Sequence, residues 1–271
     1  WYGNIMSITE LNSYCQKMRK IILKTSLECQ QPTHIGGALS IVEILAALYF
    51  KIMNINIKNP KDRFILSKGH GFLGLLSILK VKRFITQKIL NDFQKDGTDI
   101  IAHPIMRPEL GIETSNGSLG QGLSYGVGLA IANKLKGTRN SIYVLQGDGE
   151  CYEGSVWEAA ITATEMKLDN LTVLIDVNGF QNDGKINEKM NYQNLSYKWK
   201  GFGWNTVVCN GHDLESIIKA SKIKKKNKPN AIICKTTKGK GIKFMENNND
   251  WHHGRLTKNL YRDSIKSLNE N

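Results

Sequence analysis

The sequence lacks several features that mark other classes of protein. No stretch approaches the ~18 uninterrupted apolar residues of a membrane-spanning helix, and residues 1–10 lack the basic-then-apolar order of a secretory signal. We therefore expect no membrane association and a cytoplasmic location. The five cysteines are scattered and include no C-x-x-C pair, which argues against a disulfide framework or a zinc knuckle and predicts reduced thiols in the core.

Arginine is scarce in a strongly basic chain. Only seven of the 37 basic residues are arginine, although the formal net charge is +13. Arginine is expected where bases or phosphates are bound by two parallel hydrogen bonds, and the lysines are spread along the chain. We therefore expect no nucleic-acid partner and interpret the one dense cluster, Lys222–Lys228, as a solvated loop. The alternative interpretation of this cluster is a surface that weakly attracts sugar phosphates or other polyanions.

The first part of the chain is predicted to be helical. With 271 residues, 41% of them hydrophobic, the chain is long enough for one large core. Apolar residues at helical spacing predict an amphipathic helix over Leu11–Leu27, followed by a loop over Gln31–Gly37. A second, more apolar helix is predicted over Ser40–Phe50. Ser40, followed three positions later by Glu43, fits a capping box at the start of that helix.

Four short runs rich in β-branched residues are apolar almost throughout instead of alternating. Such runs are typical of parallel strands that helices cover on both faces. Helical patterns separate them at Ser155–Lys167 and Leu214–Lys222, and a glycine-containing helix over Leu119–Leu135 precedes the first run. The pattern predicts a doubly wound, mainly parallel α/β sheet with helices on both faces, in a single domain over residues 1–271. The predicted strands are Ser141–Gln146, Leu171–Val177, Thr206–Cys209 and Ala231–Lys235.

Polar segments follow two consecutive predicted strands. Gly147-Asp148-Gly149 comes after the first, and Asn178 comes directly after the second. Because parallel strands end at the same edge of a sheet, we expect the carboxylate and the amide oxygen to lie side by side there. The two glycines allow a phosphate to approach the backbone closely, and hard oxygen donors beside a phosphate suit Mg²⁺ or Ca²⁺. The alternative for the Gly-Asp-Gly segment alone is a surface turn in which the aspartate caps a helix.

The two polar segments together resemble the thiamine diphosphate motif shared by transketolases, pyruvate dehydrogenases and related enzymes. The resemblance implies the thiamine-diphosphate-binding fold and a divalent metal held by Asp148, Asn178 and the main-chain carbonyl of Phe180. It also implies that Gly149 contacts the diphosphate. Glu153 resembles a family carboxylate at a subunit interface and is not expected to be a ligand.

Other segments resemble the transketolase branch of this group. The stretch Asp62–His70, which reads D-R-F-I-L-S-K-G-H, is the most specific short match. It implies that Lys68 and His70 approach the cofactor diphosphate and the substrate. His34 lies in a T-H-I-G-G segment that resembles a second transketolase motif, with Ile35 where proline is common.

The middle of the chain continues the resemblance. His103 precedes a proline and then a G-S-L-G-Q-G segment, in the order found in transketolases. The match implies that His103 faces substrate hydroxyls and that Gly117 and Leu119 line the cofactor. Gln181 resembles a glutamine of the substrate channel in some transketolases, and we count it among the cofactor-binding candidates.

The last matching segments are K-G-K-G and W-H-H-G. They imply that Lys238 lies beside the diphosphate and that His253 both binds the cofactor and takes part in catalysis, with His252 as its less certain neighbour. Imidazoles titrate near neutral pH, so histidines suit proton transfer and the binding of sugar hydroxyls. The alternative is that these histidines bind zinc, but they lack the spacing that zinc ligands usually show in a sequence. The catalytic candidates are His34, His70, His103 and His253.

The matching segments occur in family order from about Cys15 to Leu260, which favours transketolase over a deoxyxylulose-phosphate synthase or an α-ketoacid dehydrogenase. The resemblance implies transfer of a two-carbon ketol unit between sugars or sugar phosphates. It also implies a partner, a C-terminal transketolase subunit that supplies the pyrimidine-binding domain and the activating glutamate, in a heterotetramer. A truncated fragment of a full-length enzyme, a regulatory subunit and a basic nucleic-acid-binding protein are the alternatives left open.

Overall fold

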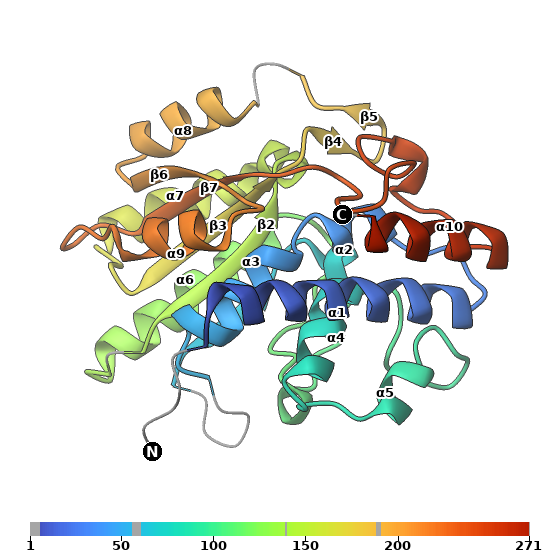
Figure 1. Ribbon diagram of the computed structural model, residues 1–271. Coiled ribbons are helices and arrows are strands. Elements are labelled where there is room, and N and C mark those ends of the chain that lie inside the picture. The colour runs from blue at the N-terminus through green and yellow to red at the C-terminus, as the bar shows by residue number, and fades with distance from the viewer. Residues whose placement is uncertain (1–5, 56–60, 139, 188–190, 271) are drawn as a thin grey trace.

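A five-stranded, wholly parallel sheet forms the centre of the computed structural model, which describes residues 6–55, 61–138, 140–187 and 191–270 (Figure 1). Residues 1–5, within the segment considered for a secretory signal, lie outside these ranges. The strand order is β1-β2-β3-β7-β6, and a separate antiparallel hairpin pairs β4 with β5. The strands are β1 (Arg63–Leu66), β2 (Ile142–Gly147), β3 (Leu171–Val177), β4 (Phe180–Gln181), β5 (Gly184–Lys185), β6 (Asn205–Asn210) and β7 (Asn230–Lys235).

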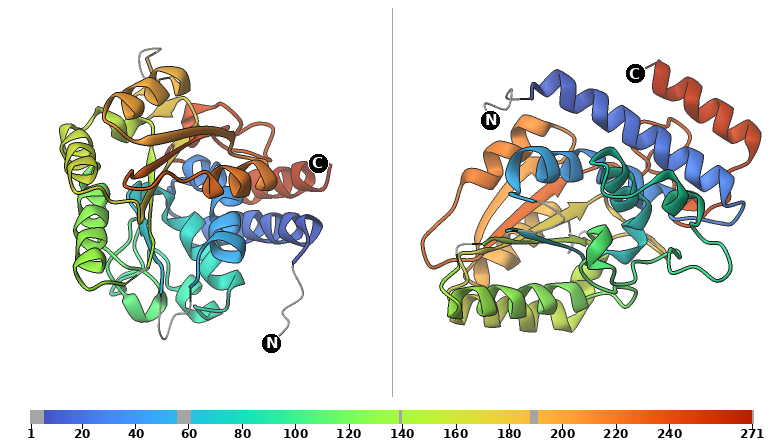
Figure 2. Two further views of the ribbon diagram at one scale, coloured as in Figure 1. Left: turned by 90° about the vertical axis from the view of Figure 1, so that its left-hand side faces the viewer. Right: turned by 90° about the horizontal axis from the view of Figure 1, so that it is seen from below.

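Helices cover both faces of this sheet, as the end-on view in Figure 2 shows. One face is covered by α6 (Gln121–Leu135), α7 (Gly154–Glu165) and α8 (Tyr192–Gly201). The opposite side holds α1 (Ile8–Glu28), α2 (Ile35–Leu39), α3 (Val42–Ala47), α4 (Phe72–Val81), α5 (Gln87–Asn91), α9 (Leu214–Lys222) and α10 (Lys258–Asn269).

The central strands bury both of their faces, which explains their continuous apolar character. In β2, Ile142 and Val144 pack into the core beneath α6 and α7. Tyr143 and Leu145, which alternate with them, pack into the core beneath α1 to α4. All residues of β2 and β3 are buried. The predicted doubly wound parallel sheet is therefore confirmed.

Predictions of local structure were less accurate where side chains bind partners distant in the sequence. The predicted helix over Ser40–Phe50 is wrong at its start, because Ser40 ends α2 and α3 begins at Val42. The predicted capping box is also wrong. The Ser40 hydroxyl donates to Asp176, and the Glu43 carboxylate pairs with Arg19. β1, a four-residue strand inside the D-R-F-I-L-S-K-G-H segment, was not predicted from the sequence.

Three sequence-based expectations concern membrane-spanning helices, the lysine-rich segment and the cysteines. Within the described ranges, no helix combines the length and the apolar composition needed to cross a membrane. Lys222–Lys228 is exposed along its whole length, at the end of α9 and in the turn after it, in agreement with the predicted solvated segment. Four of the cysteines are buried, and Cys29 is partly exposed.

Close packing of α6 on the sheet generates a first prediction. A methyl group at Gly126 would lie 2.5 Å from the Cγ2 atom of Val144, whereas one at Gly128 would meet nothing within 4 Å. Gly126→Ala should lower the free energy of unfolding by about 1–3 kcal/mol, because the Val144 side chain or the helix must move to relieve the overlap. Gly128→Ala should raise it by about 0.5–1 kcal/mol, because alanine favours helix. Urea unfolding checks both; equal effects of the two substitutions would contradict this account of the packing.

Candidate functional site

The carboxyl edge of the sheet brings Asp148 and Asn178 together, as the sequence predicted. β2 and β3 pair in register, with Gly147 opposite Asp176, so the residues that follow them lie at the same edge. The Asp148 carboxylate accepts hydrogen bonds from the backbone N–H of Gly149 at 2.9 Å and of Gly179 at 2.7 Å. One donor follows β2 and the other follows β3, so the two strand ends together orient the carboxylate.

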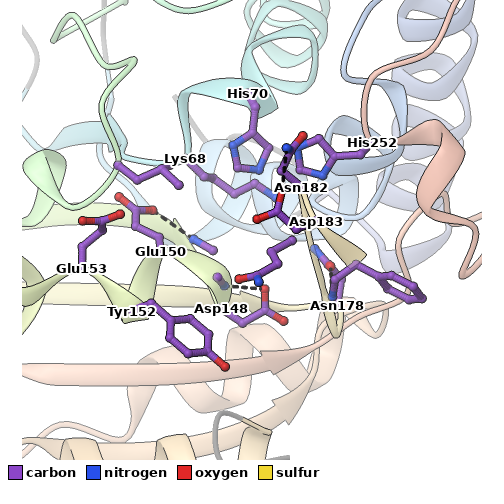
Figure 3. A pocket seen from close by; sticks show the side chains of 15 residues that line it. Lys68, His70, Asp148, Glu150, Tyr152, Glu153, Asn178, Asn182, Asp183 and His252 are labelled. Carbon is purple, nitrogen blue, oxygen red and sulfur yellow. Dashed lines mark hydrogen bonds between the residues drawn. The ribbon is translucent and has the colours of Figure 1, made fainter. Parts of the chain in front are cut away.

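A cavity of about 240 Å³ opens beside these two residues (Figure 3). Its lining combines carboxylate, amide, imidazole and ammonium groups, and the tip of the β4–β5 hairpin forms part of its wall. Nine predicted site residues line it: Lys68, His70, Leu119, Gly147, Asp148, Gly149, Asn178, Phe180 and Gln181. The others that line it are Glu150, Tyr152, Glu153, Asn182, Asp183 and His252.

The donor set at the strand ends fits a hard divalent cation. Each carboxylate oxygen of Asp148 accepts one backbone hydrogen bond, which leaves further lone pairs. The side-chain nitrogen of Asn178 donates to Asp176 at 2.9 Å, and its oxygen, Oδ1, accepts from the backbone N–H of Phe180 at 3.1 Å, which leaves it a further lone pair. No cluster of three or more histidine, cysteine or acidic side chains able to hold a metal occurs in the described residues. A cation here would therefore take its remaining ligands from backbone, water or a bound phosphate, as Mg²⁺ does.

The electrostatics of Asp148 favour a bound cation. Burial, followed by the neighbouring Asp176 carboxylate, raises the pKa of Asp148 to about 7, against the lowering effect of its two backbone hydrogen bonds. Removing a buried carboxylate from water is costly without a compensating positive charge. The site thus holds an acidic group whose ionised form is under-compensated by the chain itself.

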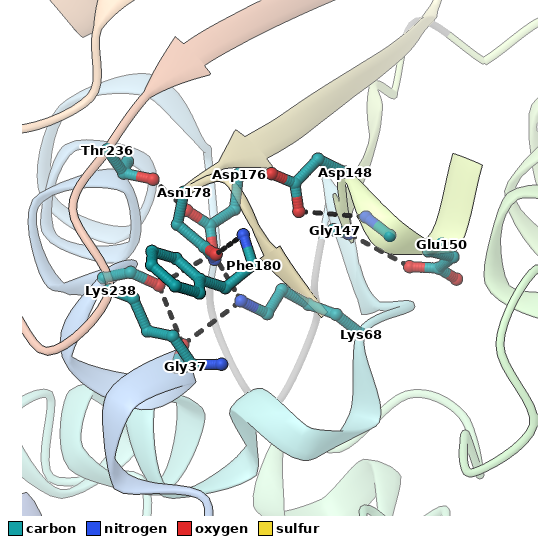
Figure 4. A network of polar contacts seen from close by, with 12 residues as sticks. Gly37, Lys68, Gly147, Asp148, Glu150, Asp176, Asn178, Phe180, Thr236 and Lys238 are labelled. Atoms are coloured by element: carbon teal, nitrogen blue, oxygen red, sulfur yellow. Dashed lines mark hydrogen bonds and ion pairs between the residues drawn. The ribbon is translucent and has the colours of Figure 1, made fainter. Parts of the chain in front are cut away.

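A buried ion pair between Lys68 and Asp176 lies directly behind this acid (Figure 4). Both side chains are fully buried. Asp176 also accepts from the hydroxyls of Ser40, at 2.7 Å, and Thr236. Burial alone would raise the pKa of Asp176, but the Lys68 ammonium and these hydroxyls hold it below its usual value. The Lys68 side chain therefore reaches the cavity with its ammonium group held at Asp176.

The four predicted catalytic histidines form one cluster. The ring of His34 is central, with centroids 5.9 Å from His70, 5.3 Å from His103 and 4.6 Å from His253. His252 joins the cluster, 5.6 Å from His34.

Burial and neighbouring positive charge lower the pKa values of His34, His70 and His252. Burial, then the neighbouring histidines, lowers the pKa of His34 to about 3. Burial, then Lys68, lowers the pKa of His70 well below its usual value, and burial, then Lys238, lowers that of His252 to about 4. Near pH 7 these rings therefore serve as hydrogen-bond donors and acceptors, and the positive charge of the site resides on its lysines.

Lys238 connects the histidine cluster to the cavity. Its ammonium group lies 2.8 Å from Nδ1 of His252 and 2.8 Å from the side-chain oxygen of Asn249. It also lies 5.5 Å from the centroid of the Phe180 ring. Burial, then Lys68, lowers the pKa of Lys238 to about 8. The amine is therefore mostly protonated at pH 7, but less strongly than a surface lysine.

The remaining five predicted residues do not line the cavity. His34, His103, His253 and Lys238 belong to the adjoining histidine cluster, and Gly117 is exposed. His252 lines the cavity while the exposed His253 does not. Neither Asp176 nor the hairpin tip was among the site residues predicted from the sequence. The Asp-Gly turn signal at residues 183–184 was available for the hairpin; nothing in the sequence indicated Tyr152.

The sheet and the acid and amide at its carboxyl edge define an α/β domain suited to hold a phosphorylated cofactor at its strand ends. Residues 12–270 match the family model described as transketolase, thiamine diphosphate binding domain. The chain belongs to the transketolase family and comprises its thiamine diphosphate-binding domain.

Individual relatives agree with this assignment. The chain is 38% identical to one of the subunits of an apulose-4-phosphate transketolase from Phocaeicola vulgatus, over 98% of this chain and 96% of that protein. It is 39% identical to a 6-deoxy-6-sulfo-D-fructose transketolase subunit from a Clostridium species, over 87% of this chain and 88% of that one. The crystal structure of Campylobacter jejuni transketolase superposes with a TM-score of 0.86 at 30% identity, covering 97% of this chain but only 43% of that one.

The buried ion pair generates a second prediction. Lys68→Met leaves Asp176 charged, buried and without its cation, which should lower the free energy of unfolding by about 3–5 kcal/mol. Lys24→Met is the matched control, since Lys24 pairs with Glu28 on the exposed face of α1, and should cost less than about 1 kcal/mol. Thermal unfolding of the ligand-free chain checks both. A Lys68→Met variant as stable as the control would contradict the role given to this pair.

Proposed function

We propose that this chain is the cofactor-holding subunit of a split transketolase, which binds thiamine diphosphate with a divalent cation and, with a second polypeptide, transfers a two-carbon ketol unit from a ketose to an aldose. The observation that carries the proposal is the convergence of Asp148 and Asn178 on one cavity, beside a cluster of histidines. Family membership supports the same activity.

Different residues of this chain would bind the cation and the diphosphate. Asp148, Asn178 and the main-chain carbonyl of Phe180 would hold Mg²⁺ or Ca²⁺, and the backbone at Gly149 would lie against the diphosphate. Lys68 and Lys238 supply positive charge beside that anion. When bound, thiamine diphosphate supplies the electron sink that allows a carbon–carbon bond beside a carbonyl to break.

The histidine cluster would bind and orient the sugar. The rings of His70, His103 and His253 lie 4.6–5.9 Å from that of His34, centroid to centroid, and imidazoles can donate to and accept from hydroxyl groups and move protons. The substrates are proposed to be ketoses and aldoses, free or phosphorylated; the relatives named after apulose-4-phosphate and 6-deoxy-6-sulfo-D-fructose support an anionic sugar.

A second polypeptide would complete the site. Relatives that share nearly the full length of this chain are named as subunits, and the chain spans 43% of the solved Campylobacter jejuni transketolase. We propose that the partner supplies the pyrimidine-binding domain with the activating glutamate, and that two such pairs form a heterotetramer in the cytoplasm. Glu153, which lies on the cavity wall, would face the subunit interface.

Replacement of the acid tests cation and cofactor binding together. Asp148→Ala removes the carboxylate that would bind Mg²⁺, so calorimetry should show a loss of thiamine diphosphate affinity of at least about tenfold in the presence of Mg²⁺. Asp213→Ala, which removes the N-cap of α9 outside the cavity, is the control and should bind as the unaltered chain does. Unchanged affinity of the Asp148→Ala variant would refute the proposed cation site.

The raised pKa of Asp148 predicts how cation affinity depends on pH. Because that pKa is about 7 in the folded chain without a cation, protons compete with the cation below pH 7. Affinity for Mg²⁺ should fall by up to about tenfold per pH unit below pH 7 and level off above pH 8. Titration of Mg²⁺ between pH 5.5 and 8.5 with saturating thiamine diphosphate measures this. A flat profile would show that a group with an ordinary acidic pKa holds the cation.

The split arrangement predicts that activity needs two chains. The purified chain alone should show no ketol transfer above background, because the activating glutamate would be absent. Addition of a protein that carries a pyrimidine-binding domain, encoded beside this one, should restore turnover. Ketol transfer measured with each protein alone and with both together checks this; robust turnover by the single chain would refute the split arrangement.

A further inference from the structure

Glu43 carries a buried carboxylate that the proposed function does not use. Its two oxygens bind different partners: Oε1 lies 2.7 Å from Nη1 of Arg19 on α1, and Oε2 lies 3.0 Å from Nδ1 of His212. His212 lies in the turn between β6 and α9 and is the one histidine of six outside the cluster at the cavity. We call Arg19, Glu43 and His212 the Glu43 network.

Both outer members of the Glu43 network reach the segment that follows β7. Nε2 of His212 accepts a hydrogen bond from the backbone N–H of Thr237 at 2.8 Å. Nε of Arg19 donates to the backbone carbonyl of Lys240 at 3.1 Å. The network therefore holds two backbone groups, one directly before Lys238 and one two residues after it.

The hydrogen bonds determine the state of each group in the network. Since Nε2 of His212 accepts from Thr237, the ring proton of neutral His212 must lie on Nδ1, where it is donated to Glu43. Burial alone would raise the pKa of Glu43, but Arg19 and His212 lower it to about 2, so the carboxylate is ionised. One carboxylate thus orients the guanidinium and the imidazole at once.

Glycines allow the close packing that these contacts require. A Cβ atom at Gly211, beside His212, would lie 2.4 Å from Cγ2 of Thr236. A Cβ atom at Gly241, where φ is +96°, would lie 2.9 Å from Nε of Arg19. The segment after β7 is consequently pressed against both outer members of the Glu43 network.

Lys238 depends on this segment for its position. Its side chain is buried, and within the described ranges it forms no ion pair with a carboxylate. Its ammonium group instead contacts Asn249 and the cavity-lining His252. A shift of the backbone at residues 237–240 would therefore move both the charge and the His252 contact at the cavity.

We infer that Glu43 and His212 are positioning residues, which hold the backbone on either side of Lys238 so that its ammonium group stays against His252 on the cavity wall. This inference rests on the proposed function, because the ligand that Lys238 would serve is the thiamine diphosphate anion. It also explains why Glu43 is buried in α3 instead of capping it.

Two substitutions of His212 separate its two hydrogen bonds. His212→Gln can place an amide oxygen where Nε2 lies and so retain the Thr237 contact. His212→Asn can place an amide N–H where Nδ1 lies, which keeps the bond to Glu43 but loses Thr237. Both leave the Arg19–Glu43 ion pair intact, so the chain keeps its buried charges compensated. Asp213→Ala, which removes the adjacent N-cap bond to Glu215 at 3.0 Å without touching the segment after β7, is the matched control.

Hydrogen exchange of the ligand-free chain, followed by mass spectrometry of a peptide spanning residues 236–242, measures the restraint without reference to any cofactor. His212→Asn should exchange there at least about tenfold faster than the unaltered chain. His212→Gln and Asp213→Ala should change this peptide little. Exchange in His212→Asn no faster than in the control would overturn the inference.

Calorimetry with thiamine diphosphate and Mg²⁺ then tests the consequence for the cavity. His212→Asn should lose about tenfold in affinity, and His212→Gln should retain most of it, a rescue that general destabilisation would not produce. Faster exchange without loss of affinity, in an assay where Asp148→Ala does lose affinity, would overturn the inference and leave the proposed function standing. If Asp148→Ala also binds normally, the proposed function fails, and with it this role of Lys238.

Discussion

The site depends on the buried ion pair between Lys68 and Asp176. Asp176 accepts hydrogen bonds from side chains on four separate segments: Lys68 after β1, Ser40 at the end of α2, Asn178 after β3 and Thr236 after β7. A carboxylate without water is tolerated only when such partners compensate it. One acid therefore holds four segments together, and Lys68 and Asn178 on two of these segments line the cavity. Asp176 also orients the Asn178 amide, whose oxygen accepts from the backbone N–H of Phe180.

Charge is distributed unevenly across the site. Asp148 is an acid with a raised pKa, Lys68 lines the same cavity, Lys238 contacts the cavity-lining His252, and the pKa values of His34, His70 and His252 are lowered. This arrangement suits an anionic cofactor with a cation at one end and hydroxyl-bearing substrates at the other. The large net positive charge of the chain is separate from the charge of this site, because much of it is carried by exposed lysines such as those of Lys222–Lys228.

Much of the architecture could be predicted because it follows from local patterns. β3 and α9 begin and end where the apolar patterns placed them, at Leu171–Val177 and Leu214–Lys222. β1 was missed because its four residues are too few to show a period. The capping box at Ser40 was wrong because buried partners distant in the sequence bind both of its side chains; the chain does contain a capping box, formed by Ser7 and Glu10 at the start of α1.

The amino-acid sequence by itself determined the parallel sheet and the groups at its carboxyl edge, since apolar runs and their neighbours are properties of short segments. It placed Asp148 and Asn178 together because parallel strands share an edge. Only the tertiary structure decided which of two adjacent histidines faces the cavity, and that Asp176 joins residues as distant as Lys68, 108 positions away. Those choices, and the protonation states that follow from them, depend on burial and on long-range partners, which exist only once the layers have packed.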